Sequence, residues 1–153
     1  MDMTSLITPA SVVANLKATS KKQALQELAR HAAFVTGLPE RLLFDTILER
    51  ERLGTTGVGN GIAVPHGKVP GLTGLCGVFA RLDRPVDFDS IDEAPVDLIF
   101  LLLAPEGAGA DHLKALAKVS RLLRDKVMCE KLRATRKAEA LYALLAESTK
   151  QAA

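Results

Sequence analysis

The run LIFLLL, residues 98–103, constrains the fold of this chain more than any other feature of its 153 residues. Successive side chains of a strand point to opposite faces of its sheet, so an unbroken apolar run must be covered on both faces. The wider run of seven apolar residues, Leu98 to Ala104, is far too short for a membrane helix, which needs about 20. We therefore expect Val96–Leu103 to be a strand at the centre of a sheet.

Two helices are expected before this strand. Ser20 followed by Gln23 has capping-box spacing, and the apolar residues after it recur at intervals of three and four, which predicts a helix ending at Gly37. Pro39 suits the first position of a second helix, which should end near Gly54.

Strands follow these helices, and further helices follow the strands. This order predicts a three-layer α/β/α sandwich with a central mixed β-sheet, formed by a single domain over residues 1–153 with an ordered core of about 5–147 and fraying from about Ser148. The other expected strands are Val12–Leu16, Ile62–Val64 and Leu75–Leu82, with an acidic connection over Asp83–Pro95, and the later helices are one that Asp111 would cap, Val127–Leu132 and Ala138–Leu145.

Composition excludes several classes of protein. The net charge of +2 is small and interspersed, and the aromatic content is 4% with no Trp, so the chain offers neither the basic footprint nor the stacking surface of a nucleic-acid binder. The first residues contain no basic segment followed by a long apolar run, so no signal peptide is expected. Cys76 and Cys129 lack CxxC spacing and are expected to be buried and reduced, and we expect a cytoplasmic protein.

The glycine-rich segment 54–61, which precedes the expected strand Ile62–Val64, predicts a loop rather than a nucleotide site. Four of the eight residues in 54–61 are glycine. Ile62 occupies the position of the third glycine of a dinucleotide fingerprint, and Val69 replaces the Ser or Thr that would hold magnesium in a P-loop. The three histidines share no H-x-H or H-x3-H spacing, so we expect no metal and no cofactor.

His66, in GNGIAVPHGKV, and His112 are the two histidines with chemical potential. A loop imidazole titrates near neutral pH, and small neighbours leave room for an incoming group, so His66 is either a reactive group or a capped loop histidine. His112 is either its partner at a helix start or a solvated first-turn residue; His31 is expected to be a partly exposed packing residue. Backbone N–H groups of the following residues are expected to cradle a phosphoryl group: Gly59, Asn60, Gly61 and Gly67.

Three stretches resemble the IIA domains of the fructose/mannitol class in the bacterial phosphoenolpyruvate-dependent phosphotransferase system, and the nitrogen-regulatory branch in particular. They are LERERLGTTGVGNGIAVPHGKVPGL (48–72), IDEAPVDLIFLLLAP (91–105) and HLKALAKVSRLL (112–123). The resemblance implies that His66 accepts a phosphoryl group, that Arg50 stabilises its charge, and that His112 donates a hydrogen bond at the site.

The resemblance also implies partners. An HPr-like carrier (NPr) would donate the phosphoryl group, and the output would reach regulatory targets such as potassium transport or a sensor kinase; a weak homodimer is a further expectation. The chain would then be a phosphocarrier with a phosphohistidine intermediate rather than a turnover enzyme. The alternatives are a sugar-transport IIA component that passes phosphate to a IIB domain, a binding module that does not use phosphorylation, and a hydrolase with His66 as general base.

Overall fold

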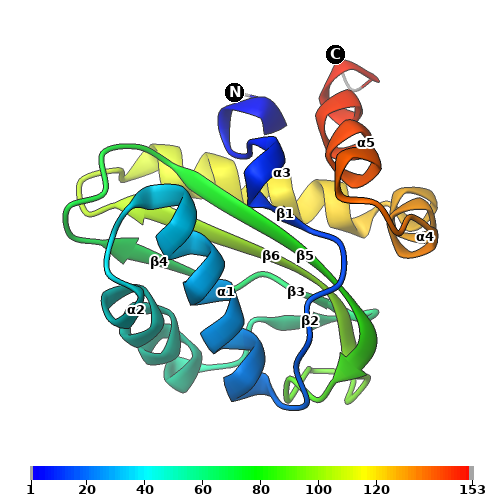
Figure 1. The fold of residues 1–153 in the computed structure, drawn as a ribbon, viewed down its shortest axis with the longest axis horizontal. Coiled ribbons are helices and arrows are strands. Elements are labelled where there is room, and N and C mark those ends of the chain that lie inside the picture. Colours follow the sequence, from blue (N-terminus) through cyan, green and yellow to red (C-terminus); the bar gives the residue numbers. More distant parts are fainter. Residues whose placement is uncertain (1, 152–153) are drawn as a thin grey trace.

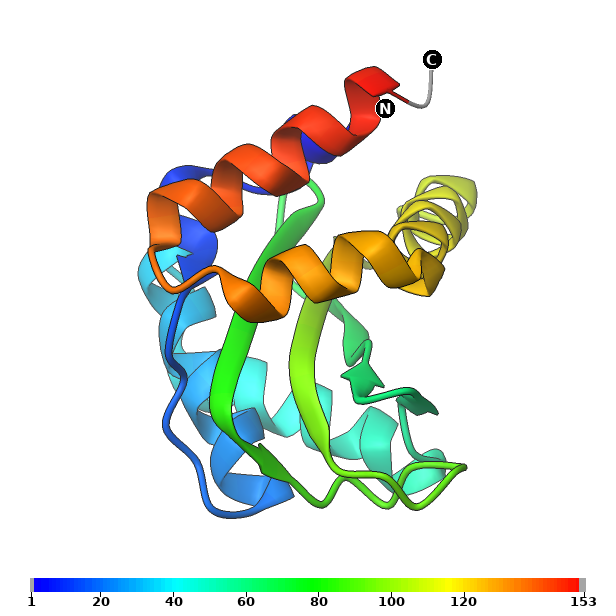
Figure 2. The same ribbon diagram turned by 90° about the vertical axis from the view of Figure 1, so that its right-hand side faces the viewer.

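A mixed sheet lies between two layers of helices in the computed structural model, which describes residues 2–151 and their side chains through Ser148. Helices α1 and α2 cover one face, and α3, α4 and α5 lie on the other (Figures 1 and 2). The strands are β1 Val12–Val13, β2 Gly57–Gly59, β3 Ile62–Ala63, β4 His66–Val69, β5 Cys76–Val86 and β6 Val96–Pro105. The helices are α1 Lys21–Thr36, α2 Glu40–Leu53, α3 Ala110–Arg124, α4 Lys126–Ala134 and α5 Ala138–Gln151, preceded by the 3-10 turns η1 Met3–Ser5 and η2 Pro9–Ser11.

Strand β6 is the centre of the sheet, as its apolar run predicts. It pairs with β5 in antiparallel orientation on one side and with β3 and β4 in parallel orientation on the other, and β1 and β2 complete the two edges. Every side chain of 98–103 is fully buried. Ile99, Leu101 and Leu103 pack with α1 and α2, whereas Leu98, Phe100 and Leu102 pack in the opposite core. The expected α/β sandwich with a mixed sheet is therefore confirmed.

The first two helices begin and end close to the expected residues. The Ser20 side chain accepts from the backbone N–H of Gln23 at 3.1 Å, and Gly37 ends α1 in the left-handed conformation at φ 75°. The Gln23 side chain accepts from the N–H of Thr19 and not from that of Ser20, so the capping box is shifted by one residue. Pro39 is the residue that caps α2, one position before the first helical residue.

The glycine-rich segment is not all loop, which corrects the expectation for residues 54–61. Gly57–Gly59 forms β2, paired with β3 through a turn at Asn60 and Gly61, both with positive φ (59° and 79°). Asn-Gly is the strongest sequence signal for a two-residue hairpin, but β2 has glycine at both ends and lacks the alternating apolar residues that normally accompany it. Gly57 is required because a Cβ there would lie 2.2 Å from Ser90 Oγ.

Other boundaries also differ from those expected. Strand β5 continues to Val86, into the connection expected over Asp83–Pro95. Helix α3 begins after Gly109, so Asp111 is a first-turn residue and not the cap. The positive end of the helix dipole still stabilises a carboxylate at this position. Helix α5 runs to Gln151, through the last residues expected to fray, and residues 152–153 lie outside the described part of the chain.

Candidate functional site

His66 is the first residue of β4, and not a loop residue as the sequence suggested. The strand forms because β6 offers a free parallel edge: His66 pairs with Leu102, whose N–H donates to the Pro65 carbonyl at 2.9 Å. Pro65 has no backbone N–H to donate, but its carbonyl still accepts a hydrogen bond of the ladder. The sheet therefore fixes the His66 backbone while its side chain stays half-buried and reachable from outside.

The His66 ring has a defined tautomer. Its Nδ1 lies 2.9 Å from the Val64 carbonyl oxygen. A carbonyl oxygen only accepts, so Nδ1 carries the hydrogen and Nε2 carries the lone pair. The guanidinium of Arg50 is consistent with this assignment, because its Nε donates to His66 Nε2 at 3.3 Å. The nucleophilic nitrogen of the ring is thus Nε2, and it faces a cation.

Arg50 comes from the last turn of α2, and a close approach of two elements brings it to His66. A Cβ on Gly67 would lie 2.9 Å from the Thr46 methyl carbon, so β4 can lie this near α2 only with glycine at position 67. Arg50, one turn after Thr46, then reaches across to the ring, and its Nη1 donates to the Gly54 carbonyl at 2.9 Å. Gly67 therefore serves helix–strand packing at the site.

His112 lies in the first turn of α3 and meets His66 edge to face, with ring centroids 5.7 Å apart and an angle of 66° between the planes. Its exposure is 7%, so it is not the solvated residue that the alternative described. Burial lowers the pKa of His112, and the nearby His66 and Lys68 lower it further, which favours the neutral ring. Its Nε2 is buried and has no hydrogen-bond partner among the described residues.

The turn expected to cradle phosphate does not join these residues. Ile62 pairs with Leu98 and His66 with Leu102, so the turn at Asn60 lies about 13 Å or more from His66 along β6. The Asn60 N–H already donates to Asp92 Oδ2 at 2.9 Å, a bond that holds the pKa of that carboxyl below its usual range. Gly59 ends β2, Asn60 and Gly61 form the hairpin turn, and only Gly67 of the expected cradle lies beside His66.

Glu51 is a buried charged residue next to Arg50 that the sequence reasoning missed. It follows Arg50 on α2, yet its side chain is buried and pairs with Lys21 Nζ at 2.8 Å. Thr56, the residue before β2, donates two hydrogen bonds to the Glu51 carboxylate, one from its hydroxyl and one from its backbone N–H at 3.2 Å. Glu51 thereby ties the end of α2 to both neighbouring segments. In the charged run of residues 49–52, the only signal in the sequence was the position of Glu51 four residues after Ile47, which puts both on the same buried face of α2.

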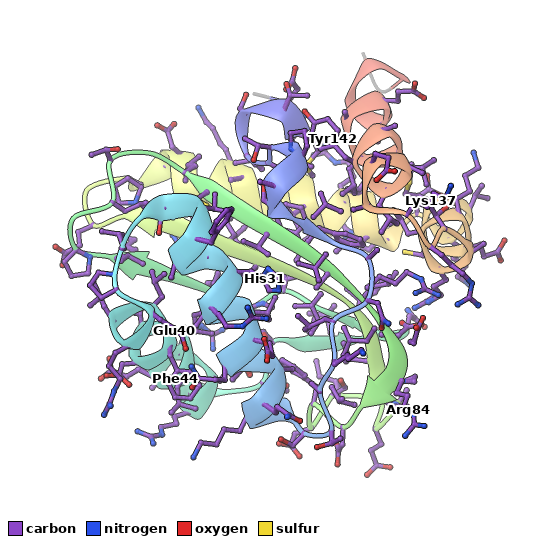
Figure 3. The ribbon with its side chains drawn as sticks, in the orientation of Figure 1. His31, Glu40, Phe44, Arg84, Lys137 and Tyr142 are labelled. Carbon is purple, nitrogen blue, oxygen red and sulfur yellow. The ribbon has the colours of Figure 1, made fainter. Side chains whose placement is uncertain are left out.

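The remaining candidate groups are placed as follows. His31 lies half-buried on α1 (Figure 3), and burial lowers its pKa. Cys76 and Cys129 are free and buried, as expected, and burial raises the pKa of Cys76 to about 11. Within residues 2–148, no group of three or more His, Cys, Asp and Glu side chains could hold a metal ion. None of the helices in the described part of the chain is long and apolar enough to cross a membrane.

A half-buried imidazole with an unprotonated Nε2, a guanidinium and a second neutral imidazole is an arrangement suited to accepting a phosphoryl group without a metal. The family model described as "Phosphoenolpyruvate-dependent sugar phosphotransferase system, EIIA 2" matches residues 5–148. The chain belongs to this family.

Within the family, the chain is similar to nitrogen regulatory proteins. It is 61% identical over 146 residues to the "Nitrogen regulatory protein" of Bradyrhizobium diazoefficiens, covering 95% of both chains. It is 45% identical over 130 residues to that of Escherichia coli K12, covering 84% of this chain and 80% of the relative. The crystal structure of nitrogen regulatory protein IIA-Ntr from Neisseria meningitidis superposes with a TM-score of 0.85 at 36% identity, covering 90% of this chain and 94% of the other.

Proposed function

We propose that this chain is the phosphoryl-carrying regulatory IIA component of a nitrogen-related phosphotransferase system, phosphorylated at Nε2 of His66. The bond from Nδ1 of His66 to the Val64 carbonyl leaves the lone pair on Nε2, and this is the observation that carries the proposal. The lone pair attacks the phosphorus of a phosphohistidine donor, the donor's P–N bond breaks, and its electron pair returns to the donor ring. The hydrogen on Nδ1 of His66 stays in place throughout, so the step needs no base.

Arg50 and His112 stabilise the transferred group. The bond from Arg50 Nε to His66 Nε2 is long, at 3.3 Å, so the guanidinium can shift to a phosphoryl oxygen and gain a stronger, charge-assisted bond. Nε2 of His112 is buried without a partner, a state that normally costs about 1–3 kcal/mol. A phosphoryl oxygen would relieve this cost by accepting from a neutral His112 that carries its hydrogen on Nε2.

The partners in this proposal are an HPr-like donor and regulatory target proteins, for which potassium transport or sensor-kinase proteins are candidates. Leu53, at the end of the helix that carries Arg50, is 84% exposed, and Leu113, next to His112, is 68% exposed. These two exposed apolar side chains are the candidates for contact with a protein partner beside the histidine site. The names of the relatives at 61% and 45% identity favour a regulatory output over sugar transport. The weak homodimer stays a prediction, which sedimentation would test.

Phosphoryl transfer from a donor chain tests the proposal. Incubation with phosphoenolpyruvate, enzyme I and the HPr-like protein should give an acid-labile, base-stable phosphate on the wild-type chain. The label should vanish in His66→Ala and persist in His31→Ala, the matched control on α1. A full yield in His66→Ala would refute the assignment. Equal target affinity for the phosphorylated and unphosphorylated chain would favour the binding-module alternative, and substrate turnover would favour a hydrolase.

A further inference from the structure

A cavity of about 600 Å³ opens between the β2–β3 hairpin and the junction of α3 and α4, outside the histidine site. Its apolar lining reaches the core on that face of the sheet: Ile62 and Val64 from β3 and the residues after it, Leu123 from α3 and Cys129 from α4 are each 2–5% exposed. Cavities of 300–1,000 Å³ with an apolar lining and a few polar groups are the usual form of a small-molecule site.

The mouth of the cavity carries cations without partners. Arg124 and Lys126 both line it, and neither forms an ion pair or side-chain hydrogen bond with any residue among the described side chains. Arg133 also lines it but is held by Asp97 at 2.9 Å. Glu130 is the one carboxylate on the lining, so the two unpaired cations outnumber it. The mouth therefore favours a single negative charge.

We propose that this cavity binds a small amphipathic carboxylate, with its apolar body against Ile62, Val64 and Leu123 and its carboxylate between Arg124 and Lys126. An apolar body gains by leaving water for the cavity lining, and the carboxylate gains charge-assisted bonds at the mouth. Neither half alone satisfies both parts of the lining. A small molecule suits the lining better than a macromolecular segment, because Ile62, Val64, Leu123 and Cys129 are buried and only Val58 offers an exposed apolar side chain.

The site is connected to His66 through Val64. Val64 lines the cavity, while its carbonyl accepts from Nδ1 of His66 and its N–H donates to the Thr56 carbonyl at 3.0 Å. Helix α3 provides a second connection, since it carries Leu123 at the cavity and His112 at the site. A bound carboxylate should therefore alter the environment of the His66 ring. An effect of the bound carboxylate on regulation by this chain rests on the proposed function. Binding itself, and the change at the His66 ring, do not.

Titration of the ¹⁵N-labelled, unphosphorylated chain with decanoate, below its micelle concentration, tests the proposal. We expect saturable amide shifts at Ile62 and Leu123 and a change in the His66 ring nitrogen signals. Decanol has the apolar body without the charge, and acetate has the charge without the body, so both should bind at least about tenfold more weakly. Equal binding of decanol and decanoate would overturn the carboxylate assignment.

Variants locate the site. Arg124→Gln with Lys126→Gln should weaken decanoate binding about tenfold or more, and Ser120→Leu at the cavity wall should weaken it sterically. Lys118→Gln is the matched control, because Lys118 is on α3 but does not line this cavity. Unchanged affinity in the double variant, or shifts confined to other surfaces, would overturn the proposal. Binding that leaves the His66 ring signals unchanged would overturn its connection to the histidine site.

Discussion

Gly67→Ala should destabilise the chain because it forces β4 away from α2. The added Cβ would lie 2.9 Å from the Thr46 methyl carbon, closer than real Cβ contacts. Overpacking of this kind costs typically about 1–3 kcal/mol. Gly67 does not have a positive φ, so alanine without the clash would instead gain about 0.5–1 kcal/mol relative to glycine in a strand.

A double variant separates the cost of the clash with Thr46 from the gain of replacing glycine in a strand. Thr46→Ser removes the obstructing methyl group but keeps the hydroxyl, which donates to the Leu42 carbonyl at 2.8 Å. In the Thr46→Ser background, Gly67→Ala should be neutral or slightly stabilising, whereas in the wild type it should be destabilising. The coupling energy of the pair should therefore be about 1–3 kcal/mol.

Urea unfolding of the wild type, Gly67→Ala, Thr46→Ser and the double variant, followed by circular dichroism, measures this coupling energy. Gly74→Ala is the control, since its Cβ would meet nothing within 4 Å and its φ is not positive. Additive effects of the two substitutions, or a Gly67→Ala chain as stable as Gly74→Ala, would refute the reasoning that glycine at 67 is required for close packing. A recovered stability should also restore the phosphorylation rate, because β4 would return to its place against α2.

Three further results are expected. Glu51→Gln should lower the free energy of unfolding by about 1.5–3 kcal/mol by removing a buried, charge-assisted network, whereas the exposed Glu49→Gln should change it little; equal urea midpoints would contradict this. Because burial lowers the pKa of His112, the unfolded chain binds more protons near and below pH 6.5, so stability should fall as pH falls through this range. His112→Gln should make that fall shallower, leaving the contribution of His31, and an unchanged slope would count against it. Arg50→Lys should slow phosphoryl transfer about tenfold in rapid-quench assays, since an ammonium cannot reproduce the guanidinium's directed donors, and wild-type kinetics would exclude that role.

Local patterns in the sequence were enough to predict the layers of the fold. The run 98–103 requires cover on both faces, and the signals at Ser20 and Gly37 mark helix ends through bonds within a few residues. The convergence of His66 with Arg50 and His112 was predicted only through resemblance, because residues 50, 66 and 112 meet by way of the sheet.

Long-range contacts decided the features that were missed. Strand β2 exists because Gly57 pairs with Ala63 and lies against Ser90, and neither partner is visible in a local glycine count. The cradle expectation was wrong for the hairpin turn because pairing with β6 separates that turn from His66. Glu51 was missed because burial of one carboxylate in a charged run depends on Lys21, 30 residues earlier in the chain.

The ring position of the phosphoryl group tests the central claim most directly. Nitrogen and phosphorus NMR of the ¹⁵N-histidine-labelled chain, phosphorylated through the HPr-like donor, identifies the residue and the ring nitrogen that carry phosphorus. We expect coupling to Nε2 of His66, with Nδ1 still protonated and bonded to the Val64 carbonyl. Phosphorus on Nδ1 of His66, or on His112 or His31, would contradict the tautomer and the site described above.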